Sequence, residues 1–131
     1  MKEISKDDLI MHSSMELPYE GGSIYFSSLD ALNIYTDIAK SKFLEDINIV
    51  KRPSTSKLLA VHLKETLFNK DLAQFIITQL VQLNNPVRKL VFVGLDSKGK
   101  RLMSNTINEC NLIVLYIFCN DYEKAKEWLI R

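Results

Sequence analysis

The sequence has 131 residues, enough for one domain with a hydrophobic core, and its apolar fraction of 47% and charged fraction of 25% are typical of globular proteins. The net charge of +1 excludes a global electrostatic field that would attract nucleic acid or an anionic membrane. The first residues are charged and form no apolar signal region, and the longest apolar run is much shorter than a membrane span. We therefore expect one cytoplasmic domain over residues 1–131, with no nucleic-acid partner and no membrane span.

Residues 1–22 give the weakest pattern in the chain. Residues 9–11 are apolar enough for a short edge strand, but Pro18 and the Gly21-Gly22 pair interrupt the region. We expect an N-terminal arm that leads into a turn. Residues 23–26 are aromatic and β-branched, which predicts the first strand of a sheet.

The first helix is expected to begin near residues 27–30, where two serines and an aspartate are suited to a helix N-terminus. Apolar residues then recur at helical spacing as far as Phe43. The end of this helix stays open between two alternatives. Residues 44–50 are either its last turns or a short extended piece, and the loop that contains Pro53 follows in both cases.

Two more strands and a helix occupy the middle of the chain. Residues 57–63 predict the second strand, and Asn69 is placed to cap a helix that stops before Pro86. The next strand, residues 87–95, is apolar without alternation, which is typical of a parallel strand covered on both faces.

The remaining chain repeats this alternation. We expect a helix over residues 97–108, a strand over residues 112–118 and a last helix capped by Asn120-Asp121. Strands that alternate with helices form βαβ units with parallel strands. The sequence therefore predicts an α/β fold in which helices pack on a four-stranded, mostly parallel sheet in the order βαβαβαβα.

The sequence gives no sign of a catalytic or metal centre. It contains neither of the glycine-rich phosphate-binding motifs and no nucleophile elbow. His12 and His62 are far apart in sequence from each other and from the two cysteines, Cys110 and Cys119. We expect His62 to be a sheet-face histidine, both cysteines to be buried free thiols, and the protein to be no enzyme and to need no cofactor.

Two segments remain as candidates for function. The turn at residues 96–99 and the loop at residues 64–70 each follow a predicted strand, at the edge of the sheet where α/β proteins present functional groups. The simpler alternatives are helix caps for the turn and a solvated connection for the loop. The partner-binding edge that we predict consists of Lys64, Thr66, Phe68, Asn69, Lys70, Asp96, Ser97 and Lys98.

The segment from Val87 to Leu129 resembles the C-terminal half of small STAS-domain proteins, the fold of anti-anti-sigma factors, and in particular a stand-alone bacterial branch. Three blocks carry the resemblance, and residues 24–26 and 57–83 match the order of elements upstream. The blocks are residues 90–95 (LVFVGL), 100–108 (KRLMSNTIN) and 122–129 (YEKAKEWL).

The resemblance implies a non-enzymatic signalling module that binds another protein, often an anti-sigma factor of the kinase type. Some members are switched by phosphorylation in a D-S-x-G-like turn that two βα units follow. Residues 96–99 have the matching letters, but only one βα unit follows them; the equivalent loop here offers Thr66. Ser97 and Thr66 are therefore the candidate phosphoacceptors.

Two further alternatives stay open. Relatives of this fold can carry a small apolar ligand or a lipid, and residues 44–50 would then act as a lid. The apolar helix edge at Ile77 and Val81 is compatible with a homodimer.

Overall fold

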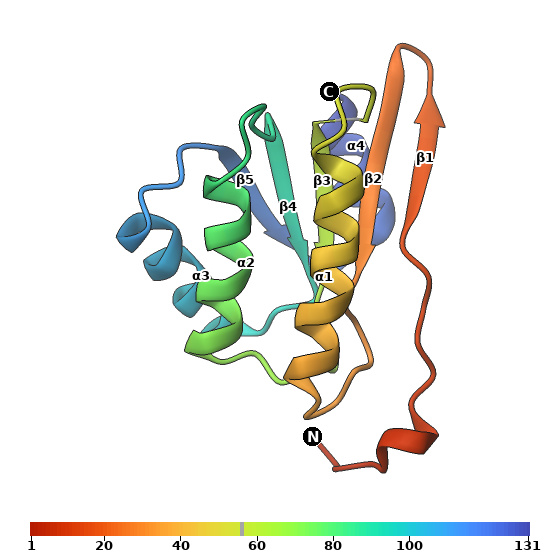
Figure 1. The fold of residues 1–131 in the computed structure, drawn as a ribbon, viewed down its shortest axis with the longest axis vertical. Coiled ribbons are helices and arrows are strands. Elements are labelled where there is room, and N and C mark those ends of the chain that lie inside the picture. Colours follow the sequence, from red (N-terminus) through yellow and green to blue (C-terminus); the bar gives the residue numbers. More distant parts are fainter. Residues whose placement is uncertain (56) are drawn as a thin grey trace.

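A mixed five-stranded sheet forms the centre of the computed structural model, which describes residues 1–55 and 57–131 (Figure 1). The strands lie side by side in the order β1-β2-β3-β4-β5. β1 is antiparallel to β2, and every other neighbouring pair is parallel. Their bounds are Met15–Tyr19 for β1, Gly22–Ser28 for β2, Leu58–His62 for β3, Lys89–Val93 for β4 and Leu115–Cys119 for β5.

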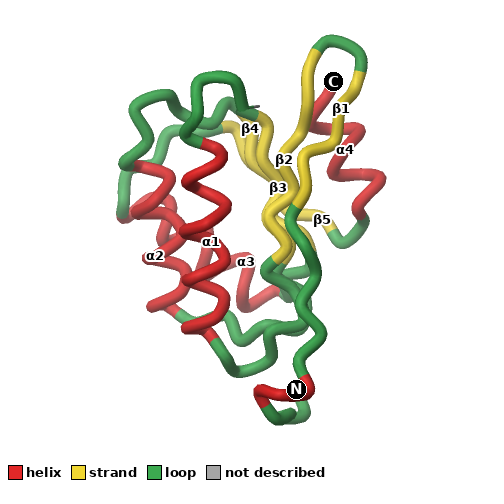
Figure 2. Tube along the Cα trace, turned by 45° about the vertical axis from the view of Figure 1, so that its right-hand side comes forward, coloured by secondary structure: helices red, strands yellow, loops and turns green. Residues whose placement is uncertain are grey.

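The helices cover the two faces of the sheet unequally. Helices α1 to α3 share one hydrophobic core with the sheet, and α4 packs on the opposite face with a second core (Figure 2). A short 3-10 helix, η1, lies in the N-terminal segment. The bounds are Lys6–Asp8 for η1, Thr36–Val50 for α1, Lys70–Val81 for α2, Ser97–Glu109 for α3 and Tyr122–Ile130 for α4.

The strand β4 is buried on both faces, as its uninterrupted apolar sequence predicts. Leu90 and Phe92 belong to the core under α1–α3, whereas Val91 and Val93 belong to the core under α4. Successive side chains of a strand point to opposite faces, so a strand between two helical layers needs apolar residues at every position.

The predicted sheet of four strands was wrong, because the expected arm contains a strand. β1 and β2 form a hairpin whose two turn residues are Glu20 and Gly21, where Gly21 has a φ of +99°. Gly22 already belongs to β2 and pairs with Tyr19, so the glycine pair that interrupts the sequence pattern marks the end of the turn and the start of a strand. Pro18 is tolerated because β1 lies at the edge of the sheet, where a strand has one side without ladder partners.

The predicted start of the first helix was also wrong. Residues 27 and 28 are the last residues of β2, and a loop follows before α1 begins at Thr36. Ala31 and Asn33 have φ values of +58° and +55° in this loop, which an α-helix does not allow. At the other end, the structure decides the open alternative for residues 44–50, which are the last two turns of α1.

The other predicted helix starts are confirmed. Asn69 caps α2 by accepting a hydrogen bond from Leu72 N, and Asp121 caps α4. Both cysteines are free, but they are half-buried and not fully buried. The expected apolar edge of α2 is divided, since Ile77 is buried in the core and Val81 is exposed.

Candidate functional site

The two loops that the sequence singles out meet at the carboxyl ends of β3 and β4. Residues 65–68, 94–96 and 98–99 line one hollow of about 310 Å³, and Met1 completes its wall. Parallel strands end at a common edge, so the loops that follow them are brought together by the topology. We call these two loops, residues 64–68 and 94–99, the strand-exit edge.

Gly94 lets the two loops approach each other closely. Its φ is +89°, a conformation that suits glycine, and a Cβ placed there would lie 2.6 Å from Lys64 Cβ. The same Cβ would lie 3.0 Å from the Cα and N atoms of Lys64. The backbone of one loop therefore rests directly on the other, which gives the strand-exit edge a fixed shape.

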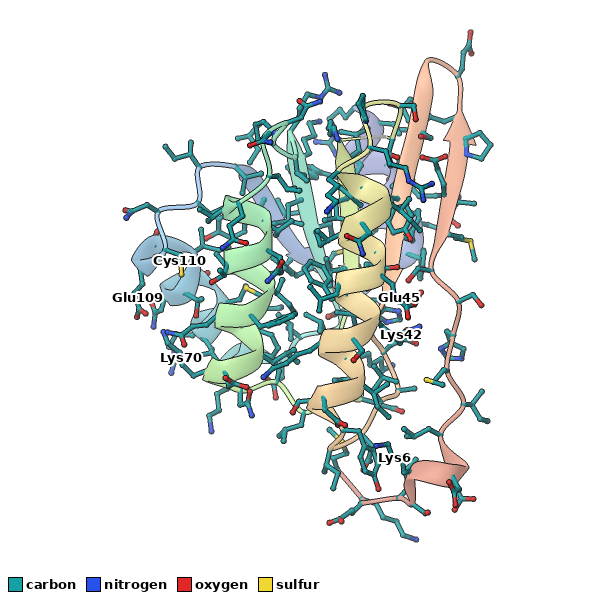
Figure 3. The ribbon with its side chains drawn as sticks, in the orientation of Figure 1. Lys6, Lys42, Glu45, Lys70, Glu109 and Cys110 are labelled. Carbon is teal, nitrogen blue, oxygen red and sulfur yellow. The ribbon has the colours of Figure 1, made fainter. Side chains whose placement is uncertain are left out.

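Several of the predicted edge residues stabilise the fold. Phe68 is half-buried against the core of α1–α3. Asn69 and Asp96 are the N-caps of α2 and α3. Lys70 forms an ion pair with Glu109, which joins α2 to α3 (Figure 3). All four predicted residues have structural roles, and Asn69, Lys70 and Asp96 also keep exposed surface that a partner can contact.

The two candidate phosphoacceptors differ sharply in accessibility. Thr66 is buried; its hydroxyl donates to Leu29 O at 2.5 Å and accepts from Leu32 N at 3.0 Å. Ser97 is exposed at the first position of α3, beside the exposed Lys98. A kinase acting on the folded chain would reach only Ser97 of the two.

Leu67 is an edge residue that sequence reasoning missed. Its side chain is 41% exposed and lines the hollow, while the neighbouring Phe68 turns inward. The main-chain N of Leu67 donates to Asn33 O at 2.7 Å, and this contact orients the residue. The contact is long-range, so the sequence carried no signal to distinguish two adjacent apolar residues.

The structure brings the only two histidines of the chain to one carboxylate, that of Asp30. His12 Nδ1 lies 2.6 Å from Asp30 Oδ2, and His62 Nδ1 lies 3.7 Å from Asp30 Oδ1. The Asp30 side chain is only 10% exposed, and within the described residues its Oδ1 has no hydrogen-bond partner. The parallel register that pairs Ser28 with His62 creates this cluster, and the sequence did not reveal that register.

A hollow of about 640 Å³ lies over this cluster. Met11, Met15 and the ring of Tyr122 form much of its lining, and Tyr122 meets His62 edge to face at 5.7 Å between ring centroids. Burial lowers the pKa of His62, an effect that the charge of Asp30 opposes. In residues 1–55 and 57–131, no group of three or more His, Cys, Asp or Glu side chains is arranged to hold a metal ion.

We expect the lowered pKa of His62 to make the stability of the protein depend on pH. The unfolded chain binds a proton at this imidazole more readily than the folded chain, so the free energy of unfolding falls as the pH falls below the ordinary value of 6.5. Urea denaturation at pH 7.5 and pH 5.5 should show a smaller loss for His62→Gln than for the unmodified protein. Equal losses in the two proteins would contradict this assignment.

A third polar cluster surrounds Asp46, a buried residue of α1. Its carboxylate accepts hydrogen bonds from Ser14 Oγ at 2.8 Å, Tyr25 Oη at 2.9 Å and Ser27 Oγ at 2.5 Å. Ser14 Oγ also accepts from Ser28 N at 2.9 Å. Burial, together with the Asp46 carboxylate, raises the pKa of Tyr25 well above its usual value. This cluster fastens the N-terminal segment and β2 to α1.

Comparisons of the chain with protein-family models, with curated proteins and with solved structures found no match. In the part of the chain that the structure describes, none of the helices is both long enough and apolar enough to cross a lipid bilayer. We therefore infer the function from the geometry of the sites.

Proposed function

We propose that this chain is a non-enzymatic module that binds another protein through its strand-exit edge. The observation that carries the proposal is the convergence of two strand-exit loops on one hollow, with Leu67 exposed at its wall. Protein interfaces place an apolar anchor at the centre and polar groups around it. Leu67 is the anchor, and Glu65, Asp96 and Lys98 are the surrounding charges.

The rigidity of this edge supports a binding role. Gly94 holds one loop against Lys64, and the buried hydroxyl of Thr66 ties the other loop to Leu29 and Leu32. A surface that is already ordered loses little conformational entropy when a partner binds. The polar groups that line the hollow include a helix-capping carboxylate and an ammonium group, a set suited to recognition.

The family resemblance agrees with this proposal. STAS-like proteins of the bacterial cytoplasm act as signalling modules, and anti-anti-sigma factors bind a regulatory protein. The blocks at residues 90–95, 100–108 and 122–129 form β4 with the start of its exit loop, much of α3, and α4. We propose the same class of activity for this chain, with a regulatory protein as its partner.

The double variant Leu67→Ala, Lys98→Glu is expected to lose the partner and keep the fold. Both residues are exposed and lie at the same hollow, so the variant removes the anchor and inverts one surrounding charge. Affinity capture from the native cell, followed by quantitative mass spectrometry, should show at least a tenfold depletion of the bound partner, since losses of a few kcal/mol are usual for an interface anchor.

A matched control removes the same kinds of side chain elsewhere. Leu44 on α1 is 42% exposed and Lys124 lies on α4, away from the strand-exit edge. The variant Leu44→Ala, Lys124→Glu should retain the partner. If both variants retain the partner and melt at the temperature of the unmodified protein, the strand-exit edge is not the surface that binds this partner.

A further inference from the structure

The domain binds the main chain of the N-terminal segment, residues 1–14, as well as its side chains. Asn33 Nδ2 donates to Lys2 O at 2.8 Å, and Asn33 Oδ1 accepts from Ile4 N at 3.1 Å. Tyr35 Oη donates to Ile4 O at 2.8 Å. Lys42, which projects from α1, donates to His12 O at 2.7 Å (Figure 3). Each of these four hydrogen bonds joins a side chain of the domain to the backbone of the segment.

Hydrogen bonds to the main chain are a common means by which proteins bind extended peptides of varied sequence. Asn33 both donates and accepts, and so it holds Lys2 and Ile4 of the segment in one orientation. Its own backbone is fixed, because Asn33 N donates to Glu65 O at 3.0 Å and Asn33 O accepts from Leu67 N. The donor and acceptor are therefore in place before a peptide arrives.

Two carboxylates add selectivity for side chains. Asp30, nine-tenths buried, binds the imidazole of His12, and its second oxygen has no hydrogen-bond partner in the described chain. Asp46 binds the hydroxyl of Ser14, two residues further on. A buried negative charge next to a hydroxyl acceptor favours a histidine or lysine followed, two residues later, by serine or threonine.

The segment buries little apolar surface of its own. Ile10 is 75% exposed and Met11 is 57% exposed. Hollows of about 480 and 530 Å³ lie along the segment, the first against the loop at Ala31 and Asn33 and the second against α1. Polar contacts, and not a packed core, hold the segment, so another chain can replace it at a small cost in buried area.

We propose that Asp30, Asn33, Tyr35, Lys42 and Asp46 form a peptide groove for an extended segment of a partner protein. The N-terminal segment is the intramolecular occupant of this groove. The incoming segment carries histidine or lysine at the position of His12 and serine or threonine at that of Ser14.

We assign the groove to a different protein, and not to a second copy of this chain, because of the affinity that is needed to displace the segment. A second copy of this protein offers the same sequence without the high local concentration of the attached segment. An occupant that displaces the segment must bind more tightly than the segment does, and a different sequence can achieve this by filling the hollows beside Ile10 and Met11. The groove adjoins the strand-exit edge, because Met1 and Glu65 line hollows of both.

The test uses full-length protein in which only the segment is weakened. Ile4→Pro removes the N–H that Asn33 accepts, and His12→Ala removes the imidazole, while every side chain of the groove is kept. The probe is a fluorescein-labelled peptide with the sequence of residues 1–14, titrated by fluorescence anisotropy. The weakened protein should bind it at least tenfold more tightly than the unmodified protein.

A third substitution, Asn33→Gly, should then reduce peptide binding at least tenfold. Glycine accepts the φ of +55° at this position, so the change removes the amide and keeps the loop conformation. The control Ile4→Val, Asp7→Ala changes two side chains of the same segment but keeps its main-chain N–H groups. Its segment should exclude the peptide to the same degree as that of the unmodified protein.

Limited digestion with trypsin at Lys2 and Lys6 separates the possible outcomes. The proposal is overturned if these sites are cleaved no faster in the weakened protein than in the unmodified protein, or if they are cleaved faster and the peptide does not bind. A concentration-dependent dimer of the weakened protein would assign the groove to a second copy and overturn the partner assignment. Equal peptide binding after Leu67→Ala, Lys98→Glu shows that the groove and the strand-exit edge are separate sites.

Discussion

Replacement of Asp46 by alanine is expected to lower the free energy of unfolding by about 4 kcal/mol, because three hydroxyl groups lose a charged acceptor at once. Tyr25 and Ser27 are buried, so water cannot freely replace the carboxylate. Single hydrogen bonds to a charged group contribute about 1.5–3 kcal/mol each, and the loss is less than their sum because the site relaxes.

The loss should extend beyond α1. Ser14 bridges Asp46 and the backbone of Ser28, so removal of the carboxylate also loosens the end of the N-terminal segment. We expect the Ser28 amide, which donates to Ser14 Oγ, to exchange faster in Asp46→Ala than in the unmodified protein. The core beneath α2 and α3 should keep its protection until global unfolding.

Urea denaturation at pH 7 measures the predicted loss, and two variants calibrate it. Asp46→Asn keeps the shape and one acceptor oxygen, and it should cost roughly half as much. Glu45→Ala changes the exposed neighbour on the same helix and should cost less than about 0.5 kcal/mol. If Asp46→Ala were no more destabilising than Glu45→Ala, the carboxylate would not be an essential acceptor.

The sequence predicted the elements from residue 57 onward well because their signals are local. An apolar run makes β4, and Asn69 and Asp121 each cap the helix that follows. Within the first 35 residues, the strand expected at residues 23–26 is confirmed as β2, whereas the arm and the start of the first helix were predicted wrongly because their conformation depends on distant contacts. Asn33 pairs with Thr66 in a β-bridge, and Thr66 in turn binds the backbone of the loop after β2.

The candidate site, too, was predicted only in part from the sequence. That the two strand-exit loops lie together follows from parallel topology, which the alternation of strands and helices predicts. The side chain that faces outward does not follow, since Leu67 and Phe68 are adjacent and both apolar. The meeting of His12 and His62 at Asp30 depends on the register between β2 and β3, and a single sequence does not specify that register.

Gly94→Ala is expected to lower the free energy of unfolding by about 3 kcal/mol or more. Part of the cost is the φ of +89°, which a residue with a Cβ adopts only under strain. The larger part is steric, because the new Cβ would lie 2.6 Å from Lys64 Cβ and 3.0 Å from two backbone atoms of Lys64. A backbone obstacle cannot rotate away, so one loop of the strand-exit edge must shift.

Gly21→Ala is the matched control, because Gly21 has a similar φ of +99° but an added Cβ would meet nothing within 4 Å. It should cost about 1 kcal/mol, the backbone term alone. The difference between the two variants in urea denaturation therefore measures the contact between the loops. If the two costs were equal, the contact between Gly94 and Lys64 would be compliant. With a compliant contact, folded Gly94→Ala protein would capture as much partner as Gly21→Ala protein. With a rigid contact, Gly94→Ala protein should capture less.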